Sequence, residues 1–306
     1  MKNVLVTGGA GFIGSHLVDE LIRNNYDVSI IDNLSRGYYK NINSKAILNK
    51  IDIRDLKNTN DVFSKFKPDI VFHMAAISSI SASDGAEIES VNVLGTNNIL
   101  KACIKNNINR LVFSSSAAIY GNPDEIPTSE NQKPKPLSKY GISKFGAEIN
   151  IVDFCKKYKL KYSILRYSNV YGPRQQHDNE GGVVSIFSNN IISSQPVSIY
   201  SNGKQTRDFI FVKDVVEANI LSSQNNLPNF ISNISTMEET SILALLNLIE
   251  KTTNISVEVA FKEGRPGEIN RSCLNNQFAN RFLGWHSSTT LPIGIKKTLD
   301  KMKTNE

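Results

Sequence analysis

The stretch NVLVTGGAGFIG, residues 3–14, decides the fold of this chain. Its apolar, β-branched start predicts a short buried strand, and the pattern from Ser15 onward predicts a helix, so the glycines between them form the turn. Gly8 permits the tight turn, Gly11 lets backbone N–H groups approach a phosphate, and Gly14 lets the helix pack closely on the strand. The N-terminus of the helix then faces an anion.

A second predicted strand, residues 26–31, supports a dinucleotide site. Asp32 stands at its carboxyl end, where a carboxylate can accept both hydrogen bonds of an adenosine ribose diol. This position favours NAD as the cofactor. Arg36 could attract the 2′-phosphate of NADP, but the Asp32 carboxylate would repel the same group, so NADP is the minor alternative.

The composition narrows the class of protein. A chain of 306 residues with 40% hydrophobic content can bury a full core in one large or two modest domains. The start leads directly into the first strand, and no apolar run approaches the roughly 20 residues of a membrane span, so we expect a soluble, cytoplasmic protein with no membrane partner. Three cysteines without CxxC spacing and four scattered histidines predict no metal site. The net charge of +6 is dispersed, which does not support nucleic-acid binding and suits an anionic small substrate.

Predicted strands and helices alternate through the first half. Further strands are expected near residues 46–53, 70–76 and 110–113, with helices at 61–66 and 87–106. This alternation predicts an α/β protein with a Rossmann-type, doubly wound parallel sheet.

Several residues at the ends of these strands are candidates for the cofactor site. Asp52 and Ile53 could contact the adenine, although a strand followed by a helix cap explains them equally well. Ala75 and Ala76 are small and leave space beside a dinucleotide. His73, within the same strand, is expected to be structural.

The fifth strand carries serines where a doubly wound sheet binds its ligands, beyond the carboxyl ends of the strands. It ends in Ser114 and Ser116, and Tyr140 and Lys144 follow, four residues apart on one face of the next helix. Tyr140 can remove a hydroxyl proton while hydride leaves the same carbon for NAD, and Ser116 can hydrogen-bond the reacting oxygen. Lowering the pKa of a phenol by about three units requires roughly 4 kcal/mol, which the Lys144 ammonium and an oxidised nicotinamide would supply.

These motifs resemble the extended short-chain dehydrogenase/reductase family, especially nucleotide-sugar 4-epimerases of the UDP-glucose 4-epimerase type. The resemblance covers nearly the whole chain through TGGAGFIG, HMAA, NVLGT, SSSAAIYG, YGISK, RYSNVYGPRQ, QTRDFIFVKDV and RPGE. It implies tightly bound NAD, a UDP-sugar substrate and a homodimer formed through the helices at 87–106 and 138–158. The cofactor residues expected from the pattern and the resemblance are Gly8, Gly11, Phe12, Ile13, Gly14, Asp32, Asn33, Asp52, Ile53, Ala75, Ala76, Asn92, Ser114, Tyr140 and Lys144.

The reaction can be narrowed by comparing members of this family. The 4,6-dehydratases place an acid pair directly after the catalytic Ser or Thr, and UDP-glucuronate decarboxylases carry a Glu in the same stretch. Here those positions are Ala117 and Ala118. We therefore expect NAD-dependent 4-epimerisation through a 4-keto sugar. The alternatives are a UDP-glucuronate 4-epimerase or decarboxylase, a dehydratase or reductase on the same scaffold, or, less favoured, a non-catalytic NAD sensor.

The resemblance assigns substrate binding to the second half. It places substrate contacts at Ser116, Asn169, Val183, Tyr200, Arg207, Arg265, Glu268 and Ser272. Ser272 falls where epimerases restricted to glucose and galactose carry a bulky tyrosine beside the sugar C2 substituent. A serine leaves room there, so we expect N-acetylglucosamine and N-acetylgalactosamine nucleotides to be accepted, alone or alongside the plain hexoses.

The expected organisation is two interleaved domains. Residues 1–167 would form the NAD-binding domain, and residues 168–306 a smaller C-terminal α/β domain for the nucleotide sugar. Within the latter, residues 213–235 are expected to return to the first domain.

Overall fold

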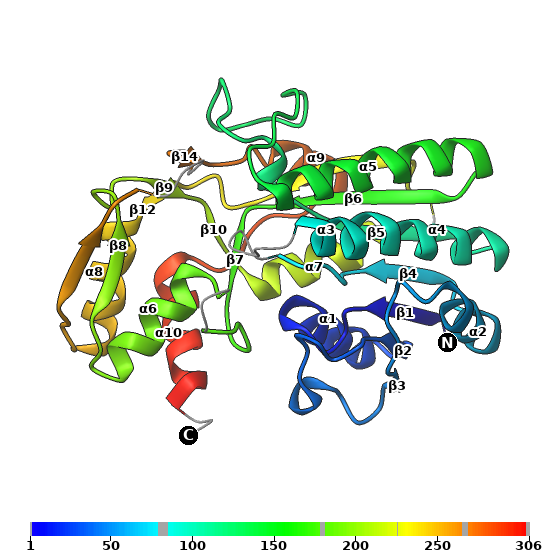
Figure 1. The fold of residues 1–306 in the computed structure, drawn as a ribbon, viewed down its shortest axis with the longest axis horizontal. Coiled ribbons are helices and arrows are strands. Elements are labelled where there is room, and N and C mark those ends of the chain that lie inside the picture. Colours follow the sequence, from blue (N-terminus) through cyan, green and yellow to red (C-terminus); the bar gives the residue numbers. More distant parts are fainter. Residues whose placement is uncertain (1, 79–84, 178–180, 225, 265–268, 304–306) are drawn as a thin grey trace.

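A computed structural model describes residues 2–78, 85–177, 181–224, 226–264 and 269–303. Its centre is a seven-stranded sheet in the order β11-β6-β5-β4-β1-β2-β3 (Figure 1). Every neighbouring pair is parallel, and the order reverses between β1 and β4, which confirms the doubly wound sheet. The strands are β1 (Asn3–Thr7), β2 (Asp27–Ile31), β3 (Ile47–Asn49), β4 (Ile70–His73), β5 (Arg110–Ser116), β6 (Lys161–Tyr167) and β11 (Phe230–Ile234).

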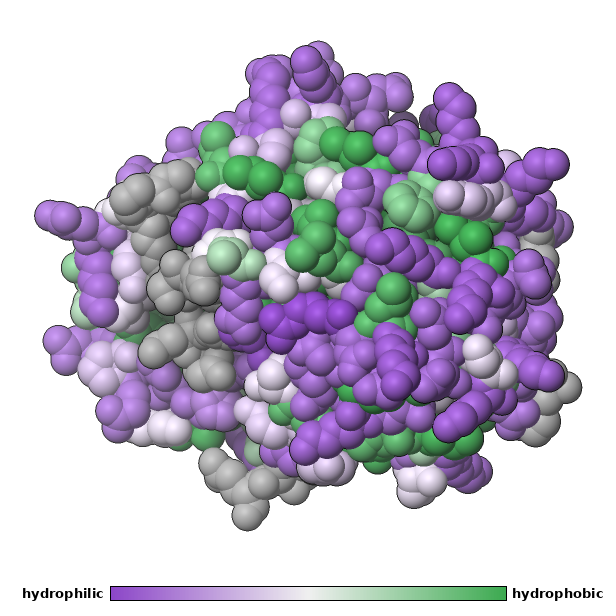
Figure 2. Space-filling model, turned by 45° about the vertical axis from the view of Figure 1, so that its right-hand side comes forward, coloured by the Kyte–Doolittle hydropathy of each residue, from purple (hydrophilic) through white to green (hydrophobic). Residues whose placement is uncertain are grey.

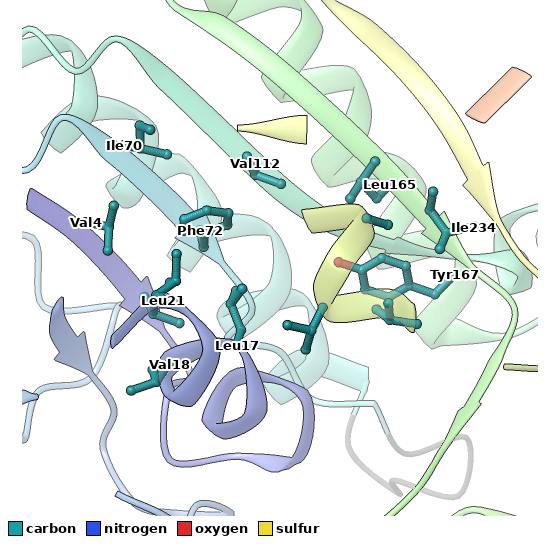
Figure 3. Packing of buried hydrophobic residues seen from close by; sticks show 14 of the residues in the cluster. Val4, Leu17, Val18, Leu21, Ile70, Phe72, Val112, Leu165, Tyr167 and Ile234 are labelled. Atoms are coloured by element: carbon teal, nitrogen blue, oxygen red, sulfur yellow. The ribbon is translucent and has the colours of Figure 1, made fainter. Parts of the chain in front are cut away.

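Helices cover both faces of this sheet because its strands are apolar on both sides. Val4 and Val6 face one hydrophobic cluster and Leu5 faces the other, as the alternation of side chains along a strand requires. Figure 3 shows Leu17 and Leu21 packed against the strands on the first face. That face is covered by α1 (Phe12–Arg23), α7 (Val212–Ser222) and α9 (Gln277–Leu283), and the other by α2 (Leu56–Phe66), α4 (Thr96–Lys105) and α5 (Lys139–Tyr158).

The helix predicted at 87–106 is not one regular helix. It consists of α3 (Gly85–Glu89), a π-helical segment (Ser90–Gly95) and α4. A Cβ atom at Gly95 would lie 2.5 Å from Cδ1 of Ile53, so the glycine allows this wider turn to press against the segment after β3. Periodicity could not reveal the change because both helix types keep one face buried.

The remaining elements form a second, smaller part of the molecule beside the carboxyl ends of the sheet strands (Figure 1). Their core is a separate hydrophobic cluster that joins α6 (Val183–Ile192), α8 (Ile242–Thr253) and α10 (Leu291–Lys303). Three small sheets flank it, made of β7 (Asn169–Tyr171) with β10 (Phe209–Phe211), β8 (Val197–Tyr200) with β13 (Val259–Lys262), and β9 (Thr206–Arg207) with β12 (Thr240–Ser241) and β14 (Arg271–Ser272). Short 3₁₀ helices span Tyr39–Asn41 and Ala117–Ile119.

The chain crosses between the two parts more than once. After β10 it returns through α7, which packs on α1, and then adds β11 to the large sheet beside β6. The second part is therefore attached along the edge where the sheet strands end.

Candidate active site

A cleft of about 770 Å³ lies along the carboxyl ends of the sheet strands, at the point where the strand order reverses. Its walls include Gly8, Gly11, Phe12, Ile13, Gly14, Asp32, Asn33, Asp52, Ile53, Ala75, Ala76, Ser114, Tyr140 and Lys144. These are the residues predicted to hold the cofactor, with the exception of Asn92. The fold therefore brings together predicted cofactor residues that are up to 136 positions apart in the sequence, from Gly8 to Lys144.

The glycine turn is shaped to receive a phosphate. Gly8 has a φ of +69°, and a Cβ atom there would lie 2.7 Å from the backbone nitrogen of Ala75. A Cβ atom at Gly14 would lie 2.1 Å from the carbonyl oxygen of Gly8. No side chain caps the N-terminus of α1 at Gly11, so its first N–H groups are left to bind an anion. This cradle fits the diphosphate of a dinucleotide.

Asp32 is held rigidly at the end of β2, with 8% of its surface exposed. Its Oδ2 accepts a hydrogen bond from the backbone N–H of Ala10 at 2.9 Å, and its Oδ1 accepts one from Leu34 at 2.8 Å. The carboxylate therefore has a fixed direction in the wall of the cleft, where an adenosine ribose would sit.

Asp52 also lies in the wall of the cleft but is already paired. Its carboxylate accepts hydrogen bonds from Nε and Nη2 of Arg54, at 2.9 and 2.7 Å, and from the side chain of Asn33 at 3.0 Å. The Arg54 guanidinium lowers the pKa of Asp52 to about 2. The sequence left open that Asp52 and Ile53 only precede a helix cap. The residue that caps α2 is Asp55, whose side chain accepts a hydrogen bond from the N–H of Asn58.

Tyr140 and Lys144 line this cleft, and Ser116, which ends β5, lies beside Tyr140. The Tyr140 phenol hydrogen-bonds the Ser116 side chain, and Nζ of Lys144 donates to the carbonyl oxygen of Ser114 at 2.7 Å. Gly141 makes these contacts possible, because a Cβ atom there would lie 2.5 Å from the carbonyl oxygen of Ala118. The first turn of α5 can thus press directly against the residues that follow Ser116.

The protonation of this group differs in part from the prediction. Burial raises the pKa of Tyr140, and the hydrogen bond from Ser116 only partly opposes this effect. Burial also lowers the pKa of Lys144 to about 7, against the opposing charge of Glu148. The Lys144 ammonium alone therefore does not lower the pKa of Tyr140. The sequence predicted two contributions, and the other is the positive charge of an oxidised nicotinamide.

A buried polar network behind Lys144 escaped the sequence analysis. Glu148, one helical turn beyond Lys144, accepts Nη2 of Arg166 at 2.6 Å and Nε at 3.0 Å. Arg166 also donates to the Tyr120 hydroxyl at 2.8 Å, and that hydroxyl donates to the side chain of Asn233 at 2.8 Å. The only signal in the sequence was an acidic residue on the buried face of a helix.

Asn92 and His73 are structural in this arrangement. Asn92 is 2% exposed, accepts the N–H of Ile77 at 2.8 Å, and donates to the carbonyl oxygen of Ile77 and to Ser143. It therefore fixes the wall of the cleft from behind and does not line it. His73 lies fully buried between the hydroxyl groups of Thr7 and Thr96, and burial lowers its pKa to about 3, as expected of a structural histidine.

Apart from Ser116, which ends β5, the described residues expected to contact substrate lie in the second part of the molecule. Arg207 and Ser272 are direct neighbours in the register of β9 and β14. Asn169 begins β7, Val183 begins α6 and Tyr200 ends β8. Arg265 and Glu268 are outside the residues that the structure describes.

Asp208, next to Arg207, is a second buried carboxylate that the sequence analysis missed. Its side chain accepts hydrogen bonds from Ser168, from the backbone N–H and hydroxyl of Thr236, and from the N–H of Leu274. Burial raises its pKa against these hydrogen bonds. Asp208 therefore ties β10 to the chain that directly follows Ser272.

Residues 4–234 match the NAD dependent epimerase/dehydratase family. The chain belongs to that family. It is therefore an NAD-dependent enzyme, as the glycine turn and Asp32 predict. The cleft lies where the order of the sheet strands reverses, which is where doubly wound sheets bind their ligands.

Individual relatives agree over the whole length. A Methanocaldococcus jannaschii protein, named provisionally as a UDP-glucose 4-epimerase, is 43% identical over 305 residues, with 99% of each chain covered. The UDP-glucose 4-epimerase of Thermotoga maritima, solved with UDP-glucose, superposes with a TM-score of 0.97 at 39% identity, with 99% of each chain covered. The UDP-N-acetylglucosamine 4-epimerase of Methanobrevibacter ruminantium, solved with UDP-N-acetylmuramic acid, reaches a TM-score of 0.93 at 32% identity, covering 100% of this chain and 99% of the other.

Two further observations concern the described ranges only. No helix within them has both the length and the hydrophobicity needed to cross a membrane. Nor do three or more His, Cys, Asp or Glu side chains within them gather as metal ligands.

Proposed function

We propose that the protein interconverts the C4 epimers of UDP-sugars, with NAD held in the cleft. The observation that carries this proposal is the placement of Tyr140 and Lys144 in the wall of a cleft built for a dinucleotide, with Ser116 hydrogen-bonded to Tyr140. Its relatives named as UDP-glucose and UDP-N-acetylglucosamine 4-epimerases support the same reaction class.

In this proposal each of the three residues has one task. Tyr140 takes the proton of the sugar 4-hydroxyl and later returns it, and Ser116 hydrogen-bonds the same oxygen. Lys144, fixed by the carbonyl oxygen of Ser114, holds the nicotinamide ribose and contributes positive charge when protonated. When bound, NAD supplies the hydride acceptor that becomes the hydride donor for the opposite face of the sugar.

The residues that follow Ser116 favour epimerisation over elimination or decarboxylation. Ala117 and Ala118 form a 3₁₀ turn that packs against α5, and neither carries an acid or a base. Elimination of water needs a general acid and a second base beside the substrate. Among the described residues from Ser116 to Ile119, Ser116 alone carries a polar side chain.

The substrate class is proposed from Ser272 and its neighbour Arg207. Arg207 carries a guanidinium suited to a diphosphate, and Ser272 lies beside it on β14 with a small side chain. We therefore propose that the pocket accepts UDP-N-acetylglucosamine and UDP-N-acetylgalactosamine in addition to UDP-glucose and UDP-galactose. Asn169, Val183, Tyr200, Arg265 and Glu268 are proposed as the remaining substrate contacts.

We further propose that the two parts of the molecule act as a cofactor domain, residues 1–167, and a substrate domain, residues 168–306, with 213–235 returning to the former. A homodimer is proposed through the helices at 87–106 and 138–158, which the structure divides into α3, the π-helical segment, α4 and α5. Leu94, Ile142 and Ile149 on these helices are 56%, 56% and 46% exposed, although they are large and apolar. Figure 2 shows hydrophobic groups of this kind among the polar side chains of one face.

The test is a chromatographic assay of the purified protein with UDP-glucose, UDP-galactose, UDP-N-acetylglucosamine, UDP-N-acetylgalactosamine and UDP-glucuronate. Bound NAD is quantified in the same preparation. The proposal expects the C4 epimer of the first four sugars without accumulation of NADH. Hexose turnover with no conversion of either N-acetylated sugar would reject the role of Ser272, and no epimer from any sugar would reject the proposed reaction.

A further inference from the structure

The segment that follows β7 reaches from the second part of the molecule to the wall of the cofactor cleft. Nε2 of His16, on α1, lies 2.8 Å from the carbonyl oxygen of Pro173. Three residues after Pro173, Gln176 donates through Nε2 to the carbonyl oxygen of Arg36 at 2.7 Å. Residues 174–176 line the cleft between these two attachments. The segment is thus fixed to the cofactor half at both of its ends.

Arg174, between these attachments, uses only part of its guanidinium. Its Nη2 donates to Asp19 on α1 at 2.7 Å, and Asp19 is itself held by Asn43 at 2.8 Å. Its Nη1 is buried and has no hydrogen-bond partner in the described part of the chain. The backbone of Arg174 has a φ of +68°, a conformation that residues with a side chain seldom adopt. A buried charged donor without an acceptor is costly, so this atom requires an acceptor that the described residues do not supply.

We propose that Arg174 binds a phosphate of the bound dinucleotide. This proposal rests on the placement of NAD in the cleft proposed above. A guanidinium suits phosphate oxygens because its N–H groups form a planar fork. Two other cations in the same cleft already have acceptors, since Arg54 is paired with Asp52 and Lys144 donates to Ser114.

The diphosphate of a UDP-sugar offers the same chemistry as the diphosphate of NAD. The dinucleotide is favoured because Asp19 fixes the guanidinium to α1, and α1 begins at the glycine turn that forms the phosphate cradle. A contact with NAD should affect cofactor retention, whereas a contact with the sugar nucleotide should affect the KM for substrate.

The experiment measures the exchange of bound NAD in the holoenzyme against radiolabelled NAD, at low and high salt. The variant is Arg174→Gln. The matched control is Arg23→Gln, which removes an exposed arginine from α1, the helix that carries Asp19. We expect Arg174→Gln to exchange NAD about tenfold faster or more, and to lose part of the salt dependence of the wild type. Arg23→Gln should exchange at the wild-type rate. Asp19→Asn, which frees the guanidinium without removing it, should give an intermediate rate.

Three results would overturn the proposal. One is an exchange rate of Arg174→Gln equal to that of the control. Another is faster exchange with unchanged salt dependence, because it would show only a loosened segment. The third is a raised KM for the UDP-sugar with unchanged NAD retention. A wild-type protein that retains no NAD would contradict the placement of the cofactor itself, and the role of Arg174 with it.

Discussion

The two parts of the molecule reach their sites by different routes. In the cofactor half, a continuous parallel sheet packed on both faces places the ends of successive strands along one edge, so that local patterns in the sequence carry the site. In the substrate half, pairs and triplets of strands two to four residues long are joined by contacts between distant segments. A site can therefore be predicted from sequence when each of its residues lies directly after a regular strand or at the start of a regular helix.

Each half also contains a buried carboxylate that the site depends on. Glu148 in the first half forms a bidentate ion pair with Arg166 and also accepts a hydrogen bond from the Ser115 hydroxyl. Asp208 in the second half forms no ion pair with a described residue and is held by neutral donors, among them Ser168 and Thr236. The ion pair with Arg166 stabilises the negative charge of Glu148, one helical turn from Lys144. The hydrogen bonds of Asp208 fix the chain directly after β9, the strand that carries Arg207.

The largest effect is expected from Tyr140→Phe, which removes the proposed proton acceptor and leaves the fold of the cofactor half intact. We expect kcat for a UDP-sugar to fall about 10³-fold, because general acid–base catalysis contributes on that order. Bound NAD should be retained. The matched control is Tyr158→Phe, at the exposed end of the same helix. A variant that keeps a tenth or more of the wild-type kcat would show that Tyr140 is not the base.

The next effect concerns the stability of the cofactor half. Arg166→Met leaves Glu148 buried without its partner, so the free energy of unfolding in urea should fall by about 3–5 kcal/mol. Arg23→Met breaks an exposed pair with Glu20 and should cost less than about 1 kcal/mol. Equal losses for the two variants would show that the buried network does not hold this half together.

A smaller effect tests the substrate half through Ser272. Ser272→Tyr fills the space proposed for an N-acetyl group, so kcat/KM for UDP-N-acetylglucosamine should fall about 10- to 100-fold. The value for UDP-glucose should change little. Ser272→Thr, which keeps most of the space, is the control. Equal losses for both sugars in the tyrosine variant would place Ser272 away from the C2 substituent.

The smallest effect is a pH dependence at the contact between the halves. Burial lowers the pKa of His16 to about 4, whereas in the unfolded chain an imidazole titrates near pH 6.5. As the pH falls from about 6.5 to 4 the unfolded state takes up the proton first, so stability is lost by up to about 1.4 kcal/mol per pH unit. Urea unfolding of His16→Gln should show a shallower loss over this range. The exposed His286→Gln should follow the wild type, and a His16→Gln profile that does the same would contradict this role.

The sequence predicts the parallel sheet and the cofactor wall because each feature is written locally. The glycine turn, Asp32 and the Tyr140–Lys144 spacing each follow one regular element, and all of them line or border the cleft. Asp208 and Arg166 could not be predicted in the same way, because their partners are 18 or more positions away along the chain. The π-helical segment was hidden for a different reason, since its buried face continues that of α4.

In the proposed reaction, hydride leaves C4 of the sugar and returns to it, while Tyr140 accepts and returns the proton of the 4-hydroxyl. The most direct test uses UDP-glucose labelled with deuterium at C4, incubated with the holoenzyme in ordinary water and followed by NMR. We predict UDP-galactose that retains deuterium at C4, without free NADH. Product that carries solvent hydrogen at C4, or label recovered in water, would contradict the account.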